Sequence, residues 1–300
     1  MTPLVSRKDE NIYVTTATCR GNFSLFAGKA ELSELLVTGA TSQIGFSIMK
    51  ELLFRHPTSK AIVASRDRRK LESMIGNLPV KMFNRVRVVE LPIEVDDLTS
   101  FNREIENIDC AVVCQGAYGQ IGHFKDLNPN LLLQSFESQL KTLLLTLKSL
   151  VSLTKEKRRR IIVLGGGGAS QGYAGLSEYG MLKSSMARLV ETISLENAGE
   201  SFTINFLGPG PFYSKMSEDV IAASVNGAEI DRRILQASLD LRSQDSEPIA
   251  QVVDACEYLF SKEARQVTGR FISAQWDNPL TENQILDNDS FKLRRIIPKA

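Results

Sequence analysis

Residues 34–45 decide the fold, and they read Glu-Leu-Leu-Val-Thr-Gly-Ala-Thr-Ser-Gln-Ile-Gly. An apolar run ends at Thr38, and apolar residues recur at helical spacing over Ile44–Phe54, so the pattern predicts a strand, a tight turn and a helix. A turn at Gly39 leaves backbone N–H groups at the positive end of the helix, where a pyrophosphate binds, and Gly45 lets the helix pack closely on the strand. A plain tight turn is the alternative, but the strand–loop–helix order favours a nucleotide site.

Short apolar runs alternate with helical stretches along the rest of the chain. After the first strand, we expect strands at Ala61–Ala64, Val86–Leu91, Cys110–Cys114, Ile161–Leu164, Phe202–Phe206 and Arg270–Ala274. Such strands are typically parallel and buried on both faces, so the sequence predicts one α/β domain with a doubly wound parallel sheet of about seven strands. We place this domain at residues 34–275. An N-terminal extension (1–33) precedes it, and a C-terminal tail (276–300) either wraps the body or reaches a neighbouring subunit.

The composition excludes several classes of function. The chain has 300 residues, and 36 Lys and Arg against 35 Asp and Glu give a net charge of +1. This balance argues against nucleic acid or an anionic membrane as the main partner, and no apolar run reaches the roughly 18–20 residues of a membrane helix. Four cysteines are too few for a disulfide scaffold and two histidines too few for a His-rich metal site, so we expect core thiols and no metal. The basic run Lys155–Arg160 indicates a solvated connection between a helix and a strand.

The first residues lack the features of a secretory signal. Met1–Ser24 carries Asp9 and Glu10 and no apolar segment of the expected length. We expect a mobile extension here, with an organelle presequence as the weaker alternative. Cytoplasmic residence is then the default expectation.

The loop and its surroundings resemble the short-chain dehydrogenase/reductase family, whose members have a Rossmann-type fold and bind NAD(P). The family's first loop reads Thr-Gly-x-x-x-Gly-x-Gly, and this chain keeps Thr38, Gly39 and Gly45 but has Gln43 in place of the middle glycine. The Gln43 side chain either crowds the cofactor phosphates or points away from them. The resemblance covers roughly residues 34–274. It implies that the cofactor is bound along Thr38, Gly39, Thr41, Ser42, Gln43, Ile44 and Gly45.

The end of the second expected strand bears on the choice of dinucleotide. It reads Ala64-Ser65-Arg66, without the acidic residue that would bind the ribose 2′-hydroxyl of NAD. Arg66 can pair bidentately with a 2′-phosphate, so we expect NADP(H) in preference to NAD(H). The alternative is that Arg66 only opens a solvated, charged helix.

A tyrosine and a lysine four residues apart, Tyr179 and Lys183, carry the expected chemistry. Residues at this spacing share one face of a helix. An ammonium beside a phenol favours the phenolate and lowers the pKa of tyrosine from about 10, and the tyrosine can then exchange a proton with a carbonyl or alcohol oxygen. The motif alone is weak, and its place after a fifth strand and a glycine-rich loop strengthens it. The resemblance implies that Tyr179 is the general acid/base and that Lys183 binds the nicotinamide ribose.

Three partner positions depart from the family pattern. The family's catalytic serine lies thirteen residues before the tyrosine, where this chain has Gly166 inside the run Gly165–Gly168, and Ser170 is a candidate substitute. The family's asparagine on the long helix falls at Gln139. Of the family's Asn-Asn-Ala-Gly segment, only Gly116 is kept. A missing serine removes one donor from the oxyanion, which costs about 2.7–4 kcal/mol in comparable sites.

The sixth expected strand runs into a Pro-Gly segment similar to the family's. The resemblance implies that the nicotinamide is held by Pro209, Gly210, Phe212 and Ser214. A strand-ending turn is the alternative. The resemblance also implies a homodimer or homotetramer that pairs through the helices carrying Gln139 and Tyr179. A stripe of leucines fits either such pairing or ordinary core packing, at Leu140, Leu143, Leu144 and Leu147.

These features predict an NAD(P)(H)-dependent oxidoreductase that interconverts a carbonyl and a secondary alcohol on a small-molecule substrate. The predicted catalytic residues are Tyr179, Lys183, Gln139 and Ser170. Two alternatives stay open. One is a catalytically impaired cofactor-binding protein, because the serine is missing and the loop is altered; the other is an interaction protein of the same fold that binds no nucleotide.

Overall fold

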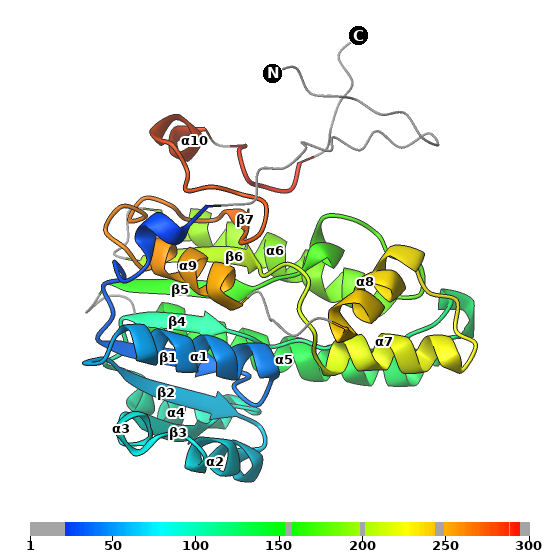
Figure 1. Cartoon of the computed structure of the whole chain (residues 1–300), viewed down its shortest axis with the longest axis horizontal. Helices are drawn as coiled ribbons and strands as arrows, with labels where there is room; N and C mark the ends of the chain where they lie inside the picture. The colour runs from blue at the N-terminus through cyan, green and yellow to red at the C-terminus, as the bar shows by residue number, and fades with distance from the viewer. Residues whose placement is uncertain (1–21, 154–157, 199–201, 244–248, 288, 295–300) are drawn as a thin grey trace.

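A computed structural model describes residues 22–153, 158–198, 202–243, 249–287 and 289–294. These form one seven-stranded parallel sheet in the order β3-β2-β1-β4-β5-β6-β7 (Figure 1). The strands are β1 (Glu34–Thr38), β2 (Lys60–Ser65), β3 (Val86–Glu90), β4 (Cys110–Val113), β5 (Arg159–Leu164), β6 (Phe202–Gly208) and β7 (Phe271–Ser273). The predicted doubly wound α/β fold is confirmed, and each expected strand lies within two residues of the observed one at both ends.

Helices cover both faces of the sheet because side chains alternate along each buried strand. Leu35 and Val37 pack towards one face, against α1, α2 and α9, and Leu36 packs towards the other, against α4, α5 and α6. The α-helices are α1 (Gln43–Arg55), α2 (Arg68–Gly76), α3 (Val80–Phe83), α4 (Leu98–Glu104), α5 (Pro129–Ser152), α6 (Ser177–Glu196), α7 (Lys215–Val225), α8 (Arg232–Arg242), α9 (Ile249–Leu259) and α10 (Glu282–Leu286).

The strand order reverses between β1 and β4. In an open parallel sheet, ligands bind outside the carboxyl ends of the strands at this switch point. The expected phosphate loop follows β1, and the segment with Gly116 follows β4. Figure 1 shows α7 and α8 side by side beyond the same edge of the sheet, the end towards which the strand arrows point. The topology therefore brings the predicted site residues to one edge.

The segments outside the predicted domain pack against it where the structure describes them. Phe23 is buried against Tyr258 of α9, so residues 22–33 belong to the body rather than to an extension. At the other end, the Phe271 N–H in β7 donates to the Phe291 carbonyl oxygen at 2.6 Å, and the Arg270 guanidinium donates to three carbonyl oxygens of residues 285–290. The described part of the tail thus wraps the body. Residues 1–21, which hold most of the predicted mobile extension, lie outside the described residues.

The end of the basic run is not the solvated connection that we expected, whereas Arg158 is exposed and residues 155–157 lie outside the described residues. Arg159 and Arg160 belong to β5 and are buried. The Arg159 side chain donates to the carbonyl oxygens of Glu106 and Ile108, and Arg160 forms an ion pair with Glu31. Backbone acceptors and one carboxylate offset the burial of these two charges, so this end of the run is part of the packed structure.

Three of the cysteines are buried free thiols, as expected: Cys110, Cys114 and Cys256. Cys19 lies outside the described residues. In the expected leucine stripe on α5, Leu143 and Leu147 are core residues, whereas Leu144 is exposed. Over the ranges that the structure describes, no helix has the length and apolar character needed to cross a membrane, and no group of three or more His, Cys, Asp or Glu side chains could hold a metal ion.

Candidate active site

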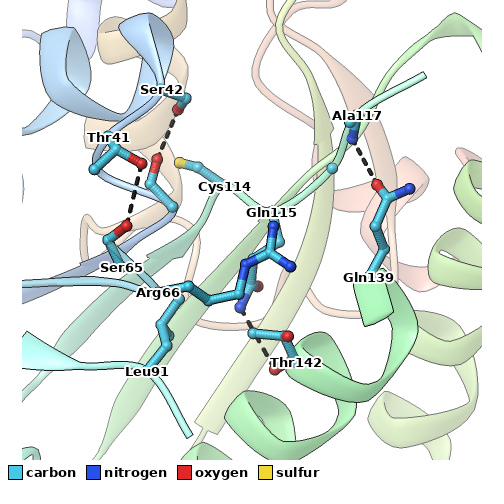
Figure 2. A pocket seen from close by; sticks show the side chains of 12 residues that line it. Thr41, Ser42, Ser65, Arg66, Leu91, Cys114, Gln115, Ala117, Gln139 and Thr142 are labelled. Atoms are coloured by element: carbon cyan, nitrogen blue, oxygen red, sulfur yellow. Dashed lines mark hydrogen bonds between the residues drawn. The ribbon is translucent and has the colours of Figure 1, made fainter. Parts of the chain in front are cut away.

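A cavity of about 200 Å³ lies at the switch point of the sheet (Figure 2). Its walls come from the loop after β1, the ends of β2 and β3, the segment after β4, and α5. The lining residues are Gly39, Thr41, Ser42, Ser65, Arg66, Leu91, Cys114, Gln115, Gly116, Ala117, Gln139 and Thr142. Seven of these residues were predicted as site residues. Sequence reasoning missed Leu91, Cys114, Gln115, Ala117 and Thr142.

The loop after β1 needs both of its glycines. Gly39 has φ +63°, and a Cβ there would lie 2.7 Å from the carbonyl oxygen of Cys114 after β4, so only glycine lets the two loops touch. A Cβ at Gly45 would in turn lie 2.9 Å from the Gly39 carbonyl oxygen. The Ser42 hydroxyl accepts the Gly45 N–H at 3.1 Å and caps α1. Gln43 is exposed and does not line the cavity, so it does not crowd the space that the cavity offers.

The end of β2 forms the polar side of the cavity. The hydroxyls of Thr41 and Ser65 are 3.1 Å apart and hydrogen-bonded, and the Asp67 N–H donates to the same Ser65 oxygen. Figure 2 shows the Arg66 side chain extending from this point towards α5. Its Nη1 donates to the Ser138 hydroxyl at 2.9 Å. Arg66 is exposed and lines the cavity, and among the described residues this neutral hydroxyl is the partner of its guanidinium.

The Gln115 side chain leaves a polar atom in the cavity wall without a partner. Its amide nitrogen donates to the Thr146 hydroxyl at 3.1 Å, while its Oε1 is buried with no hydrogen-bond partner among the described residues. A buried acceptor of this kind costs free energy unless a ligand or water satisfies it. The Gly39–Gly45 cradle at a helix N-terminus and the Arg66 guanidinium fit a nucleotide phosphate, because both supply donors. The orphaned Gln115 acceptor fits a donor instead, such as a ribose hydroxyl or the adenine amino group.

Tyr179 and Lys183 share the buried face of α6, with 8% and 5% of their surface exposed. The Lys183 ammonium donates to the carbonyl oxygen of Leu164 at 3.1 Å, at the end of β5, and to that of Gln115 at 3.5 Å. Burial lowers the pKa of Lys183 to about 8. A Cβ at Gly116, which has φ +144°, would lie 2.8 Å from Lys183 Nζ. Lys183 thus lies directly behind the Gly116 wall of the cavity.

The glycine run after β5 is explained by aromatic side chains that occupy the space of the missing side chains. A Cβ at Gly165 would overlap the Phe206 ring, and one at Gly166 would overlap the Tyr179 hydroxyl. At Gly168 a Cβ would lie 2.6 Å from two carbons of the Tyr179 ring. A serine at position 166, where the family has its catalytic serine, would therefore displace the Tyr179 phenol.

The pKa of Tyr179 is not lowered, as we had expected from Lys183. Burial raises it above the usual value, and Tyr118 and Tyr173 raise it further. The Tyr118 ring lies edge-on to the Tyr179 ring with centroids 4.7 Å apart, and it helps to bury the Tyr179 side chain. Lys183 directs its hydrogen bonds to Leu164 and Gln115 instead of to the phenol, so the expectation of a lowered pKa is wrong for this structure.

A buried carboxylate beside the tyrosine was missed by sequence reasoning. Glu178 is 1% exposed, and its Oε2 accepts the Gln120 N–H at 2.9 Å. Gln139 Nε2 lies 3.4 Å from Glu178 Oε1, while Gln139 Oε1 accepts the Ala117 N–H at 2.6 Å. Gln139 therefore bridges α6 and the segment after β4. The only sequence signal was Gly119, which has φ +70° and whose Cβ would overlap the Glu178 carboxylate.

The remaining predicted residues lie away from the cavity. Ser170 is exposed, and its hydroxyl donates to the Gly167 carbonyl oxygen at 3.0 Å rather than to Tyr179. Thr38 is buried at the end of β1, and Ile44 lies in the first turn of α1. The predicted nicotinamide residues lie between the end of β6 and the start of α7, where Ser214 is the N-cap, and they comprise Pro209, Gly210, Phe212 and Ser214. Their roles stay predictions.

Comparison with known proteins agrees with this geometry. A family model described as enoyl-(acyl carrier protein) reductase matches residues 63–275. The chain belongs to the short-chain dehydrogenase/reductase family. Members of this family are Rossmann-fold, NAD(P)-dependent oxidoreductases. No curated protein matches the chain.

Solved structures of this family share the fold at low sequence identity. A short-chain dehydrogenase from Shigella flexneri 2a, complexed with NADP, is 16% identical with a TM-score of 0.67, over 83% of this chain and 99% of that one. The KRED1-Pglu enzyme is 17% identical with a TM-score of 0.69, over 80% and 99%. The ligand-free aldohexose dehydrogenase of Thermoplasma acidophilum is 17% identical with a TM-score of 0.64, over 81% and 92%.

Proposed function

We propose that this short-chain dehydrogenase/reductase is an NADP(H)-dependent oxidoreductase that interconverts a carbonyl and a secondary alcohol, with Tyr179 exchanging the proton. One observation carries the proposal. Tyr179 and Lys183 lie on one buried face of α6, and the Lys183 ammonium lies against Gly116 in the wall of the cavity at the switch point. A proton-exchanging group and an amine thus adjoin a cofactor site.

The chain's own residues suit the parts of NADP(H). The Gly39–Ser42 loop at the start of α1 would hold the pyrophosphate, and Arg66 at the cavity mouth would pair with the 2′-phosphate. Lys183 would bind the nicotinamide ribose. The cofactor, when bound, supplies or accepts the hydride. An NADP complex of the Shigella protein with the same fold supports this choice by analogy.

The raised pKa of Tyr179 bears on the form in which this side chain meets its substrate. A phenol whose pKa lies above its usual value keeps its proton at neutral pH. Tyr179 is therefore ready to donate a proton to a carbonyl oxygen as that oxygen gains negative charge, which is reduction. We accordingly propose that Tyr179 acts as the acid when a carbonyl is reduced, and as the base when the alcohol is oxidised.

The surroundings of Tyr179 favour an uncharged, largely apolar substrate. They come from the segment after β4, the loop before α6, and α7 with α8. These side chains are Leu176 and Val220 with Tyr118, Ile121, Tyr173, Met216, Ile230, Ile234 and Leu235. A ligand that replaces such contacts loses least free energy when it is itself apolar apart from its carbonyl.

Replacing Tyr179 with Phe tests the proposal. We expect the variant to lose about 10²–10⁴-fold in kcat, the usual contribution of a general acid, because only the proton donor is removed. NADPH affinity, measured by calorimetry, should stay within about twofold because the hydroxyl does not line the cavity. Retained turnover on a panel of apolar ketones would refute the role of Tyr179.

The missing serine supports a second candidate, a protein that binds the cofactor and does not turn over. At position 166 the structure offers no hydroxyl beside Tyr179, and Ser170 is bonded elsewhere. This candidate predicts NADPH binding by calorimetry with no turnover of any carbonyl in the panel. Measurable reduction that depends on Tyr179 would exclude it.

A further inference from the structure

We propose that Glu178 and Gln139 form a clasp that positions the segment after β4, residues 116–120, both as a wall of the cofactor cavity and as a cover over Tyr179. The proposal rests on the proposed function for its consequence, cofactor binding. The clasp itself rests on contacts among the chain's own residues. Glu178 is a positioning residue, since it does not line the cavity.

The clasp holds the segment at two points, one on each side of Tyr118. On one side the Ala117 N–H donates to Gln139 Oε1 at 2.6 Å, and on the other the Gln120 N–H donates to Glu178 Oε2 at 2.9 Å. The two side chains are joined to each other through the Gln139 amide and Glu178 Oε1 at 3.4 Å. Tyr118 is therefore fixed between two anchored amides.

Burial of the Glu178 carboxylate costs free energy, which the contacts of the clasp offset only in part. Glu178 is 1% exposed, and within the described parts of the chain no Lys, Arg or His side chain forms an ion pair with it. Its partners are one backbone N–H and one amide, and a carboxylate withdrawn from water with only neutral donors costs free energy. Gly119 keeps the space for the carboxylate open, at a φ of +70° that other residues rarely adopt.

The clasp affects both the wall of the cofactor cavity and the cover over Tyr179. Ala117, Gly116 and Gln139 line the cofactor cavity, so an unanchored segment would leave that wall undefined. Tyr118 packs edge-on against Tyr179, so the same anchors fix the cover over the phenol. Glu178 thus acts on the site through Gln139 and the backbone of residues 117–120.

The test compares Glu178→Gln with the exchange variant Glu178→Gln/Gln139→Glu in the full chain. The single variant places an amide donor opposite the Gln139 amide, so we expect about tenfold weaker NADPH binding by calorimetry. The exchange variant restores a donor facing an acceptor, and the carboxylate introduced at position 139 can still accept the Ala117 N–H. Because Gln139 lines the cavity, the recovery that a coupling between the two positions requires is measured as amide protection in the unliganded chain rather than as NADPH affinity.

Hydrogen exchange provides a readout that needs no cofactor. In the unliganded chain, Glu178→Gln should raise the exchange of the amides in residues 116–120 by about tenfold, with the exchange variant close to wild type. If the wild type does not bind NADPH, the proposed function is refuted, and the hydrogen-exchange measurement still decides whether the clasp exists. Unchanged hydrogen exchange in Glu178→Gln would overturn the proposal. If the wild type binds NADPH, an equal NADPH affinity in Glu178→Gln would overturn it as well.

A second pair of variants guards against misfolding. Gly119→Ala pushes a methyl group into the Glu178 carboxylate, so it should reproduce the loss of NADPH affinity and of amide protection seen in Glu178→Gln. Gly28→Ala is the matched control, because Gly28 has a similar φ of +75° with nothing within 4 Å of an added Cβ. Equal behaviour of these two alanine variants would contradict the clasp.

Discussion

Two halves of one site meet at Gly116, and they are built differently. On one side, the loop after β1 and the end of β2 line an open cavity with residues expected from the sequence. On the other, the Tyr179 phenol lies in the space of a missing side chain at Gly166 and beneath the Tyr118 ring. The first half is made by backbone turns, whereas the second depends on packing among segments far apart in the chain.

Of the glycine, arginine and lysine replacements that compare the two halves, Gly166→Ser should have the largest effect. If the Tyr179 half were only a site that had lost its serine, this change would restore activity. Because the Tyr179 hydroxyl occupies the space of the new side chain, we expect kcat/KM to fall by about 100-fold, the scale of a misplacement of about 1 Å. Steady-state kinetics check this, with Gly76→Ala, where nothing lies within 4 Å of an added Cβ, as the control. A rise in activity would show that the phenol does not lie where the structure has it.

Replacing Gly39 with Ala tests the other half in the same way. The added Cβ would lie 2.7 Å from a backbone oxygen of Cys114, and the φ of +63° adds strain of about 1–3 kcal/mol. We expect the loops after β1 and β4 to separate and NADPH affinity to fall by about 10–30-fold, measured by calorimetry. Gly76→Ala again serves as the control, and wild-type affinity in Gly39→Ala would contradict the phosphate-loop assignment.

Replacing Arg66 with Ala should show whether the cavity half of the site distinguishes NADPH from NADH. Losing a charged hydrogen-bond partner should weaken NADPH binding about tenfold and leave NADH binding within about twofold. Arg68→Ala is the matched control, since Arg68 is paired with Glu72 on the surface of α2. An equal loss for both dinucleotides would show that Arg66 does not read the 2′-phosphate.

The smallest effect concerns the buried amine of Lys183. Its pKa is lowered to about 8 in the folded chain, against 10.5 for the unperturbed group. Below pH 8 both states are protonated and the full penalty of burying the charge is present. Between about pH 8 and 10.5 the folded state releases the proton first, so this contribution to stability rises with pH.

The variant Lys183→Met isolates that contribution from the other titrating groups. The free energy of unfolding of Lys183→Met minus that of wild type should therefore be more positive at pH 7 than at pH 9.5. Denaturant unfolding at the two pH values measures it. A pH-independent difference would show that Lys183 titrates in the folded chain at its ordinary pKa.

The same contrast explains what could be predicted from the sequence. Local patterns sufficed for the seven strands and for the loop with Gly39 and Gly45, because turns and buried strands are encoded within a few residues. Burial of Arg159 could not be predicted, since its acceptors at Glu106 and Ile108 are supplied by another segment. The prediction of a lowered pKa for Tyr179 was wrong for a similar reason. Burial by rings far away in the sequence outweighs an ammonium that donates its hydrogen bonds to other groups.

A crystal structure of the protein with NADP⁺ tests most directly whether Tyr179 and Lys183 face the reactive ring of the cofactor. The account predicts the adenosine half in the cavity beside Ser65 and Arg66. It also predicts the nicotinamide ribose within hydrogen-bond reach of Lys183 Nζ, with the Tyr179 hydroxyl turned to the nicotinamide. A dinucleotide bound with its nicotinamide away from α6, or out of reach of the Tyr179 hydroxyl, would contradict it.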